Sequence, residues 1–139
     1  MKPKKLLAKC AIVTASAVAG AQSADAQTAR DKDNAYFNSA YTFCDAKKIG
    51  VVWNQNAYGG KQVIGAKILS GLTHLADADI KSTSRTVACT FRELELTYED
   101  AQRLASYWNM SVGQAKTHAE ALGSKWGGKE FRRRLSGVI

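Results

Sequence analysis

A segment of thirteen residues occurs twice in this chain, and the second copy follows the first at a distance of 55 residues. The copies begin at Thr42 and Thr97, and five of the thirteen positions are identical. Average amino-acid usage gives about one identity in such a window. Four further positions keep their physical type, such as an aliphatic residue in both copies. We therefore predict an internal repeat near 42–67 and 97–122.

Each copy predicts one helix with its own start, buried stripe and end. Thr42 and Thr97 stand three residues before Asp45 and Asp100, which is the spacing of a capping box. Apolar residues then recur at helical spacing and form one stripe in each copy. The predicted core residues are Ala46, Ile49, Trp53, Ala101, Leu104 and Trp108. An Asn follows each Trp, and Asn tolerates the left-handed conformation that ends many helices.

The first 26 residues have the pattern of a signal peptide. Four lysines precede a short apolar stretch over 10–21, which is too short to span a membrane. Ala24 and Ala26 then provide an A-x-A cleavage site, and a cut after Ala21 is the alternative. We expect an exported chain that begins at Gln27, in the periplasm of a Gram-negative bacterium and otherwise secreted.

Cleavage at this site would leave two cysteines, Cys44 and Cys89. An even pair in an oxidising compartment predicts one intramolecular disulfide. A redox-active pair is the alternative, but the chain has no C-x-x-C motif. The bridge would tie the start of the first repeat helix to the segment before the second.

The rest of the chain predicts a single all-α domain over 36–139, preceded by a flexible segment over 27–35. A Gly- and Asn-containing turn over 55–60 leads into a long helix with apolar residues recurring from Ile64 to Leu75, and this helix should fray near Lys81 to Thr86. The segment 87–96 reads as an extended or loosely helical connector. The predicted fold consists of two similar helix-turn-helix units, clamped by the disulfide and followed by a basic element over 125–139.

The sequence lacks the motifs of common enzymes. It contains no G-x-S-x-G, P-loop, dinucleotide-binding or H-E-x-x-H motif. His74 and His118 stand without a second ligand at metal-binding spacing. Asp45 and Asp100 resemble a carboxylate pair, but helix capping accounts for both. We predict no catalytic residue, no cofactor and no metal, which leaves a cell-wall hydrolase as the weakest alternative.

Positive charge is concentrated at the C-terminus. The whole chain carries a net charge of +8, and loss of 1–26 removes four lysines and Asp25, which leaves +5. The candidate partner-binding residues are Lys125, Lys129, Arg132, Arg133 and Arg134. A basic terminus of this kind can hold an acidic protein or an anionic envelope component, or it can be a solvated helix end. Nucleic acid is a poor partner for an exported chain, and no nucleic-acid motif is present.

A small exported helical chain with one disulfide across about half its length resembles the acid-activated periplasmic chaperones of enteric bacteria. This resemblance covers architecture and transfers no site residue. It implies a stress chaperone as the alternative function. The residues themselves favour a non-enzymatic binding module, an adaptor or inhibitor, that acts on a protein or anionic envelope partner and has no transmembrane segment after cleavage.

Overall fold

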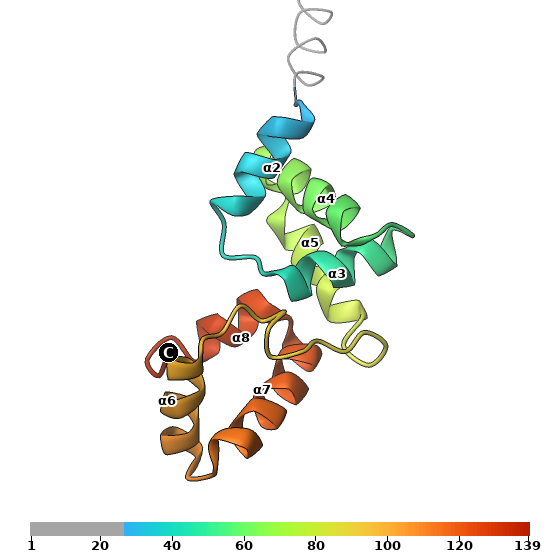
Figure 1. The fold of residues 1–139 in the computed structure, drawn as a ribbon. Helices are drawn as coiled ribbons and strands as arrows, with labels where there is room; N and C mark the ends of the chain where they lie inside the picture. Colours follow the sequence, from blue (N-terminus) through green and yellow to red (C-terminus); the bar gives the residue numbers. More distant parts are fainter. Residues whose placement is uncertain (1–26) are drawn as a thin grey trace, which may run out of the picture.

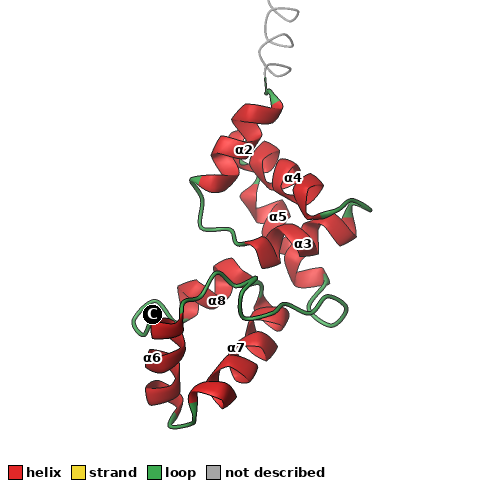
Figure 2. Ribbon diagram, viewed as in Figure 1, coloured by secondary structure: helices red, strands yellow, loops and turns green. Residues whose placement is uncertain are grey.

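The computed structural model describes residues 27–139, and this part of the chain is helical and contains no strand (Figure 2). The all-α prediction is therefore confirmed. The predicted signal peptide, 1–26, lies outside the described residues. None of the described helices is both long and apolar enough to cross a membrane. The helices are α2 (Ala29–Phe37), α3 (Phe43–Val52), α4 (Ala57–Leu69), α5 (Thr73–Ser82), α6 (Tyr98–Trp108), α7 (Val112–Trp126) and α8 (Gly128–Arg134).

The predicted starts and ends of α3 and α6 are confirmed. Thr42 and Thr97 are their N-caps, and each forms a reciprocal capping box with the aspartate three residues later. Asn54 and Asn109 both adopt positive φ, 52° and 54°, in the turns that follow. The next helices, α4 and α7, also begin 55 residues apart, at Ala57 and Val112.

Two segments differ from the sequence-based expectation. The stretch 27–35, predicted to be flexible, holds most of α2, because Thr28 and Asp31 form a capping box that the sequence reading overlooked. The predicted long helix is two helices, α4 and α5. The chain breaks between them at Gly71, where φ is 69°, a conformation that glycine adopts at little cost.

The helices form two halves, each with its own apolar core. In Figure 1, α2, α3, α4 and α5 form one half, and α6, α7 and α8 the other. The core of the second half also includes the disulfide and Leu94 and Leu96 from the connector. Helix α3 contributes to both cores, because Cys44 faces the second half while Ala46 and Ile49 face the first. Helix α3 therefore packs into both halves.

Most of the predicted core residues are buried. Ala46, Ile49, Ala101 and Leu104 are fully buried. Trp108 is half-buried against the core of the second half.

The prediction for Trp53 is wrong, since this side chain is 48% exposed. Trp53 caps the C-terminal end of α3, and its ring is held by charged neighbours rather than by a core. Its indole N–H donates to Asp79 Oδ2 at 3.1 Å, and the Lys67 ammonium lies 5.1 Å from the ring centroid.

Close contact between α3 and α4 depends on glycine. A Cβ at Gly60 would collide with the backbone of Ala46, and one at Gly50 would collide with the carbonyl oxygen of Asn56. The corresponding positions 55 residues later, in α6 and α7, are occupied by alanine. The close crossing of the first helix pair therefore has no room for a methyl group at either glycine.

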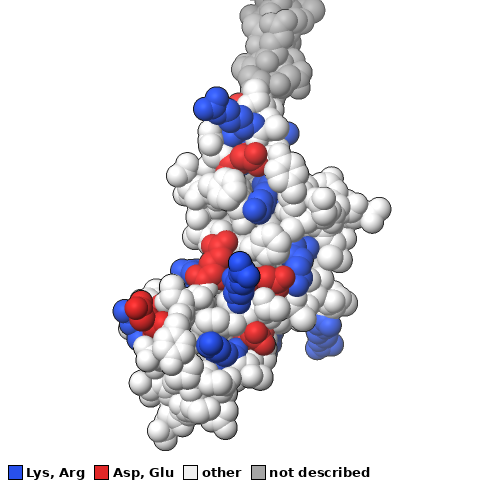
Figure 3. All heavy atoms as spheres, in the orientation of Figure 1, with Lys and Arg blue, Asp and Glu red and all other residues white. Residues whose placement is uncertain are grey.

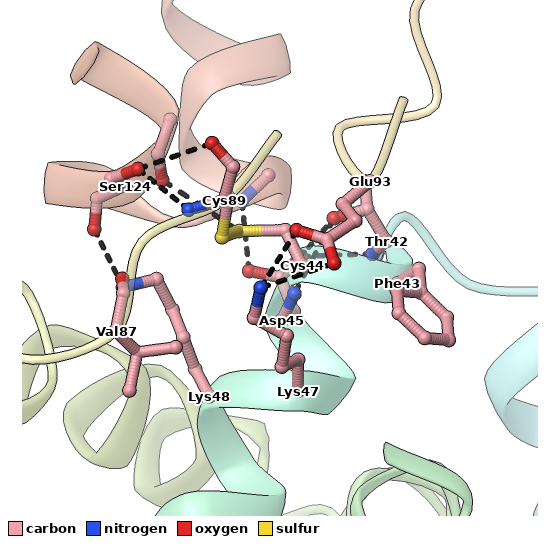
Figure 4. The surroundings of a disulfide bond; sticks show 12 residues. Thr42, Phe43, Cys44, Asp45, Lys47, Lys48, Val87, Cys89, Glu93 and Ser124 are labelled. Carbon is pink, nitrogen blue, oxygen red and sulfur yellow. Dashed lines mark hydrogen bonds and ion pairs between the residues drawn. A yellow bond between two sulfur atoms is a disulfide. The ribbon is translucent and has the colours of Figure 1, made fainter. Parts of the chain in front are cut away.

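The predicted disulfide is present between Cys44 and Cys89, 45 residues apart in sequence. It attaches the connector between α5 and α6 to the first turn of α3 (Figure 4). Next to it the Cys44 N–H donates to the Glu93 carbonyl at 2.9 Å, and Lys47 pairs with the Glu93 carboxylate at 2.8 Å. The connector is held by these contacts and contains turns rather than a strand.

Candidate functional site

A cavity of about 470 Å³ opens between α5 on one side and α7 and α8 on the other. Its lining from α5 comes from one helix face, because the residues recur at spacings of three and four. The residues that line this cleft are Asp45, Asp77, Ile80, Lys81, Ser84, Lys125, Trp126, Lys129, Glu130 and Arg134. Three of these, Lys125, Lys129 and Arg134, belong to the predicted basic cluster. The cleft therefore lies where the two halves meet.

Asp45 is fully buried beside the cleft, and its carboxylate accepts hydrogen bonds at the N-terminal ends of α3 and α8. Its Oδ2 accepts hydrogen bonds from the Thr42 N–H at 2.8 Å and from the Thr42 hydroxyl at 3.1 Å. From α8, the Gly128 N–H donates to Oδ1 and the Lys129 N–H to Oδ2, each at 2.9 Å. Burial raises the pKa of this carboxyl, and the donated hydrogen bonds oppose that rise. Asp45 thus completes the predicted capping box of α3 and also accepts hydrogen bonds from the first two N–H groups of α8.

Lys48, one turn after Asp45 on α3, is also fully buried. Its ammonium donates to the carbonyl oxygens of Thr83 at 3.2 Å, Val87 at 2.9 Å and Ser124 at 2.5 Å, and Figure 4 draws Lys48 with Val87 and Ser124. Burial lowers the pKa of this ammonium, and the negative charge of Asp45 opposes the shift. The ammonium satisfies carbonyls from the end of α5, from the connector and from α7.

Sequence reasoning missed the role of Lys48. The sequence offered one indication of it: Lys48 follows the capping residue Asp45 by three positions and stands directly before Ile49, a residue of the apolar stripe. The second copy has the same pattern, with Asp100 and Arg103, yet these side chains form a partly exposed ion pair at 3.4 Å. The same local pattern therefore produces a buried arrangement in α3 and a surface pair in α6.

The predicted basic cluster is mostly engaged within the protein. Lys129 binds both carboxylate oxygens of Asp77 at 3.0 Å, and its ammonium lies 4.3 Å from the Tyr41 ring centroid. Arg132 donates to the carbonyl oxygens of Leu94, at 3.3 Å, and Glu95. Arg132 therefore anchors α8 to the connector.

Arg133 and Arg134 share Glu130, at 2.6 and 2.9 Å. These two hydrogen-bonded arginines hold the pKa of Glu130 down to about 2. The Arg134 guanidinium also lies 4.3 Å from the centroid of the Trp126 ring, which lines the cleft. Arg134 is thus fixed by a carboxylate and an indole.

Two lysines of the cleft differ from the rest of the basic cluster. Lys125, at the end of α7, and Lys81, at the end of α5, are exposed and have no acidic side chain within 4 Å in the part of the chain that the structure describes. Lys81 was not among the predicted site residues, because only the fold brings α5 beside α7 and α8. The cleft therefore offers two cations without an internal counter-charge.

The two histidines lie outside this cleft. His118 packs edge-on against the Trp108 ring at 4.6 Å, and His74 is on the exposed start of α5. Across residues 27–139, no three His, Cys, Asp or Glu side chains are grouped to hold a metal ion. The two cations of the cleft that lack a counter-charge, Lys81 and Lys125, are suited to binding an anion. No protein-family model, curated protein or solved structure matches this chain.

Proposed function

We propose that this protein is a non-enzymatic binding module, an adaptor or inhibitor, that holds an acidic group of a protein or anionic envelope partner in the cleft between α5 and α7–α8. The observation that carries the proposal is the pair Lys81 and Lys125, two exposed cations that line one cavity and have no acidic partner within residues 27–139. Opposite charge across an interface provides specificity and speeds association.

The charge distribution supports a localised site rather than a broad cationic surface. Acidic and basic side chains are interspersed on the face shown in Figure 3 and gather at the level where the two halves meet. Within the cleft, Asp77 pairs with Lys129, and Arg134 shares the carboxylate of Glu130 with Arg133. An acidic partner would therefore gain most from Lys81 and Lys125.

We also propose that the chain is exported, with 1–26 as its signal peptide. The support is the buried disulfide, since such bonds form and persist in oxidising compartments. Mass analysis of protein from the periplasm would give the mass of 27–139 if this is correct. Protein that retains residues 1–26 in the cytoplasm would contradict it.

Binding to hexaglutamate, a defined acidic peptide, tests the proposed function. Fluorescence anisotropy of labelled hexaglutamate should report binding that weakens between 0.01 M and 0.15 M salt, where the Debye length falls from about 30 to about 8 Å. The double variant Lys81→Ser with Lys125→Ser should lose about tenfold in affinity, since two exposed charges at about 0.7 kcal/mol each contribute about 1.4 kcal/mol in total.

A matched control removes the same charge elsewhere. Arg30 and Arg92 are exposed and lie outside the cleft. Their double replacement by serine should leave hexaglutamate affinity within about twofold of the wild type. Equal losses in the two double variants would show that only net charge matters and would refute the cleft as the binding site.

A stress chaperone is the second candidate, and exposed apolar side chains favour it. Phe37, Leu72, Leu75 and Tyr98 are all at least 39% exposed. A chaperone of this kind should lose fixed structure in acid and expose more apolar surface, whereas a binding module should stay folded. Near-ultraviolet circular dichroism and dye binding at pH 3 distinguish the two candidates.

We further propose that 42–67 and 97–122 are two copies of one helix-turn-helix unit. The equal spacing of helix starts supports this, and so do two lysine–aromatic contacts: Lys61 lies 5.4 Å from the Phe43 ring centroid, and Lys116 lies 5.4 Å from that of Tyr98. Exchange of the first turn for the second, Gln55→Met with Asn56→Ser, should then change stability by less than about 1 kcal/mol. Chemical denaturation measures this, and a larger loss would argue against interchangeable units.

A further inference from the structure

We infer that the cleft recognises a single negative charge carried on an apolar body, such as the terminal carboxylate of a peptide that ends in an aromatic residue. This inference rests on the proposed function, because it names the chemistry that the same cleft would accept. Three properties of the cavity lead to it: its size, its charge balance and its apolar wall.

The cavity is the size of a small-molecule site. Its volume of about 470 Å³ lies within the range of roughly 300–1,000 Å³ that is usual for ligand pockets. A space of this size encloses one or two amino-acid residues rather than a length of polymer. The recognised unit is therefore compact, and the rest of a larger partner would lie outside the cleft.

The charge balance limits the ligand to about one negative charge. The cleft contains four cationic residues and three acidic ones, and Asp77 and Glu130 pair with two of the cations. Asp45 is held by hydrogen bonds from backbone N–H groups and a hydroxyl. A second negative charge inside the cleft would be repelled by these three carboxylates, whereas one carboxylate can pair with Lys81 and Lys125. The other charges of a polyanion such as hexaglutamate would therefore remain outside the cleft.

The apolar wall explains why the ligand needs more than a charge. Ile80 and the half-buried Trp126 line the same cavity as the two lysines. Ile80 is only 4% exposed, so an apolar group placed here would bury its own surface and the exposed part of Trp126, at about 25 cal/mol for each Å² removed from water. The Arg134 guanidinium, held over the Trp126 ring by Glu130, would form a fixed edge of this wall.

Binding in this position would also connect the two halves of the molecule. Lys81 and Ile80 belong to α5, while Lys125 and Trp126 belong to α7. A ligand that contacts both sides would favour the folded arrangement and raise the melting temperature as its concentration increases.

N-acetyl-L-phenylalanine combines the two required features in one small molecule. Its amide, N-acetyl-L-phenylalaninamide, lacks the charge, and acetate lacks the apolar body. Isothermal titration should show N-acetyl-L-phenylalanine binding at least tenfold more tightly than either compound. The signal of the Trp126 indole N–H in NMR spectra should shift on titration, while those of Trp53 and Trp108 stay in place. Equal binding of the acid and its amide would overturn the inference.

Variants locate the site. Lys81→Ser with Lys125→Ser should reduce the affinity for N-acetyl-L-phenylalanine at least tenfold, while Arg30→Ser with Arg92→Ser should leave it unchanged. The melting temperature of each free variant shows whether it is folded, since exposed charges contribute little to stability. A folded Lys81 and Lys125 variant that binds as well as the wild type would refute the assignment.

Two further comparisons separate the possible outcomes. A peptide of four serines and a C-terminal phenylalanine, with a free or an amidated end, distinguishes a chain terminus from a free carboxylic acid as the source of the ligand. Binding of hexaglutamate without binding of N-acetyl-L-phenylalanine would refute this inference and leave the proposed function standing. Binding of neither probe would refute both.

Discussion

Replacement of Asp45 by asparagine tests the central structural claim, that one buried carboxylate holds the starts of both α3 and α8. Asparagine has nearly the same shape but only one acceptor oxygen. Its Oδ1 could keep either the Gly128 bond or the three bonds that Oδ2 accepts from Thr42 and Lys129, while its NH₂ group would face donors on the other side. The variant would also leave the buried Lys48 ammonium without a nearby negative charge.

The expected loss of stability follows from these contacts. Hydrogen bonds to a charged group contribute about 1.5–3 kcal/mol each, and removal of one member of a buried charged arrangement costs about 3–5 kcal/mol. We expect Asp45→Asn to lower the free energy of unfolding by about 3–5 kcal/mol. The free energy of unfolding of a small domain is about 5–15 kcal/mol, so this loss would leave the variant with little remaining stability.

Asp100 supplies a matched control, because it occupies in α6 the capping-box position that Asp45 occupies in α3. It caps α6 through the Thr97 N–H at 2.8 Å, and its ion pair with Arg103 is partly exposed. Loss of such a cap costs about 0.5–2 kcal/mol. Asp45→Asn should therefore destabilise the protein by roughly 3 kcal/mol more than Asp100→Asn.

Urea denaturation followed by tryptophan fluorescence measures both variants. Hydrogen exchange at the Gly128 and Lys129 amides adds a local test, since these N–H groups should lose protection in Asp45→Asn and keep it in Asp100→Asn. Equal destabilisation by the two substitutions would show that Asp45 acts only as a cap of α3, and the proposed link to α8 would fail.

Three further predictions concern stability. Replacement of Cys44 and Cys89 together by serine should cost about 4 kcal/mol in the chain-entropy model, and an unchanged urea midpoint would rule out a structural role. Gly60→Ala should cost about 1–3 kcal/mol of stability, because the added methyl group overpacks α3 against α4. Gly113→Ala, where a Cβ meets open space, should be neutral or stabilising. Similar effects of the two substitutions in calorimetry would contradict the close crossing of α3 and α4. Glu130 has its pKa lowered from 4.5 to about 2, so its ion pairs contribute stability above pH 4.5 that disappears as pH falls toward 2. The wild type should exceed Glu130→Gln by up to about 1 kcal/mol at pH 6 and match it at pH 2, as acid denaturation can check.

The sequence alone predicted the features that depend on a few neighbouring residues. A threonine and an aspartate three positions apart determine the starts of α3 and α6, because a capping box is formed within one turn. The pairing of Cys44 with Cys89 also followed, because 27–139 contains only these two cysteines. The all-α class came from the helical spacing of apolar residues.

The tertiary structure determined which side chains of these helices are buried and which line the cleft. Asp45 and Asp100 belong to the same local pattern, yet one is fully buried while the other keeps a partly exposed ion pair. The difference arises because α8 packs on Asp45, and Gly128 is 83 residues away in sequence. The cleft depends in the same way on Lys81 and Lys125, which come together only when the end of α5 lies beside α7. Capping is a local hydrogen-bond pattern that the sequence displays directly, whereas burial and the lining of a cavity depend on which distant segments pack together.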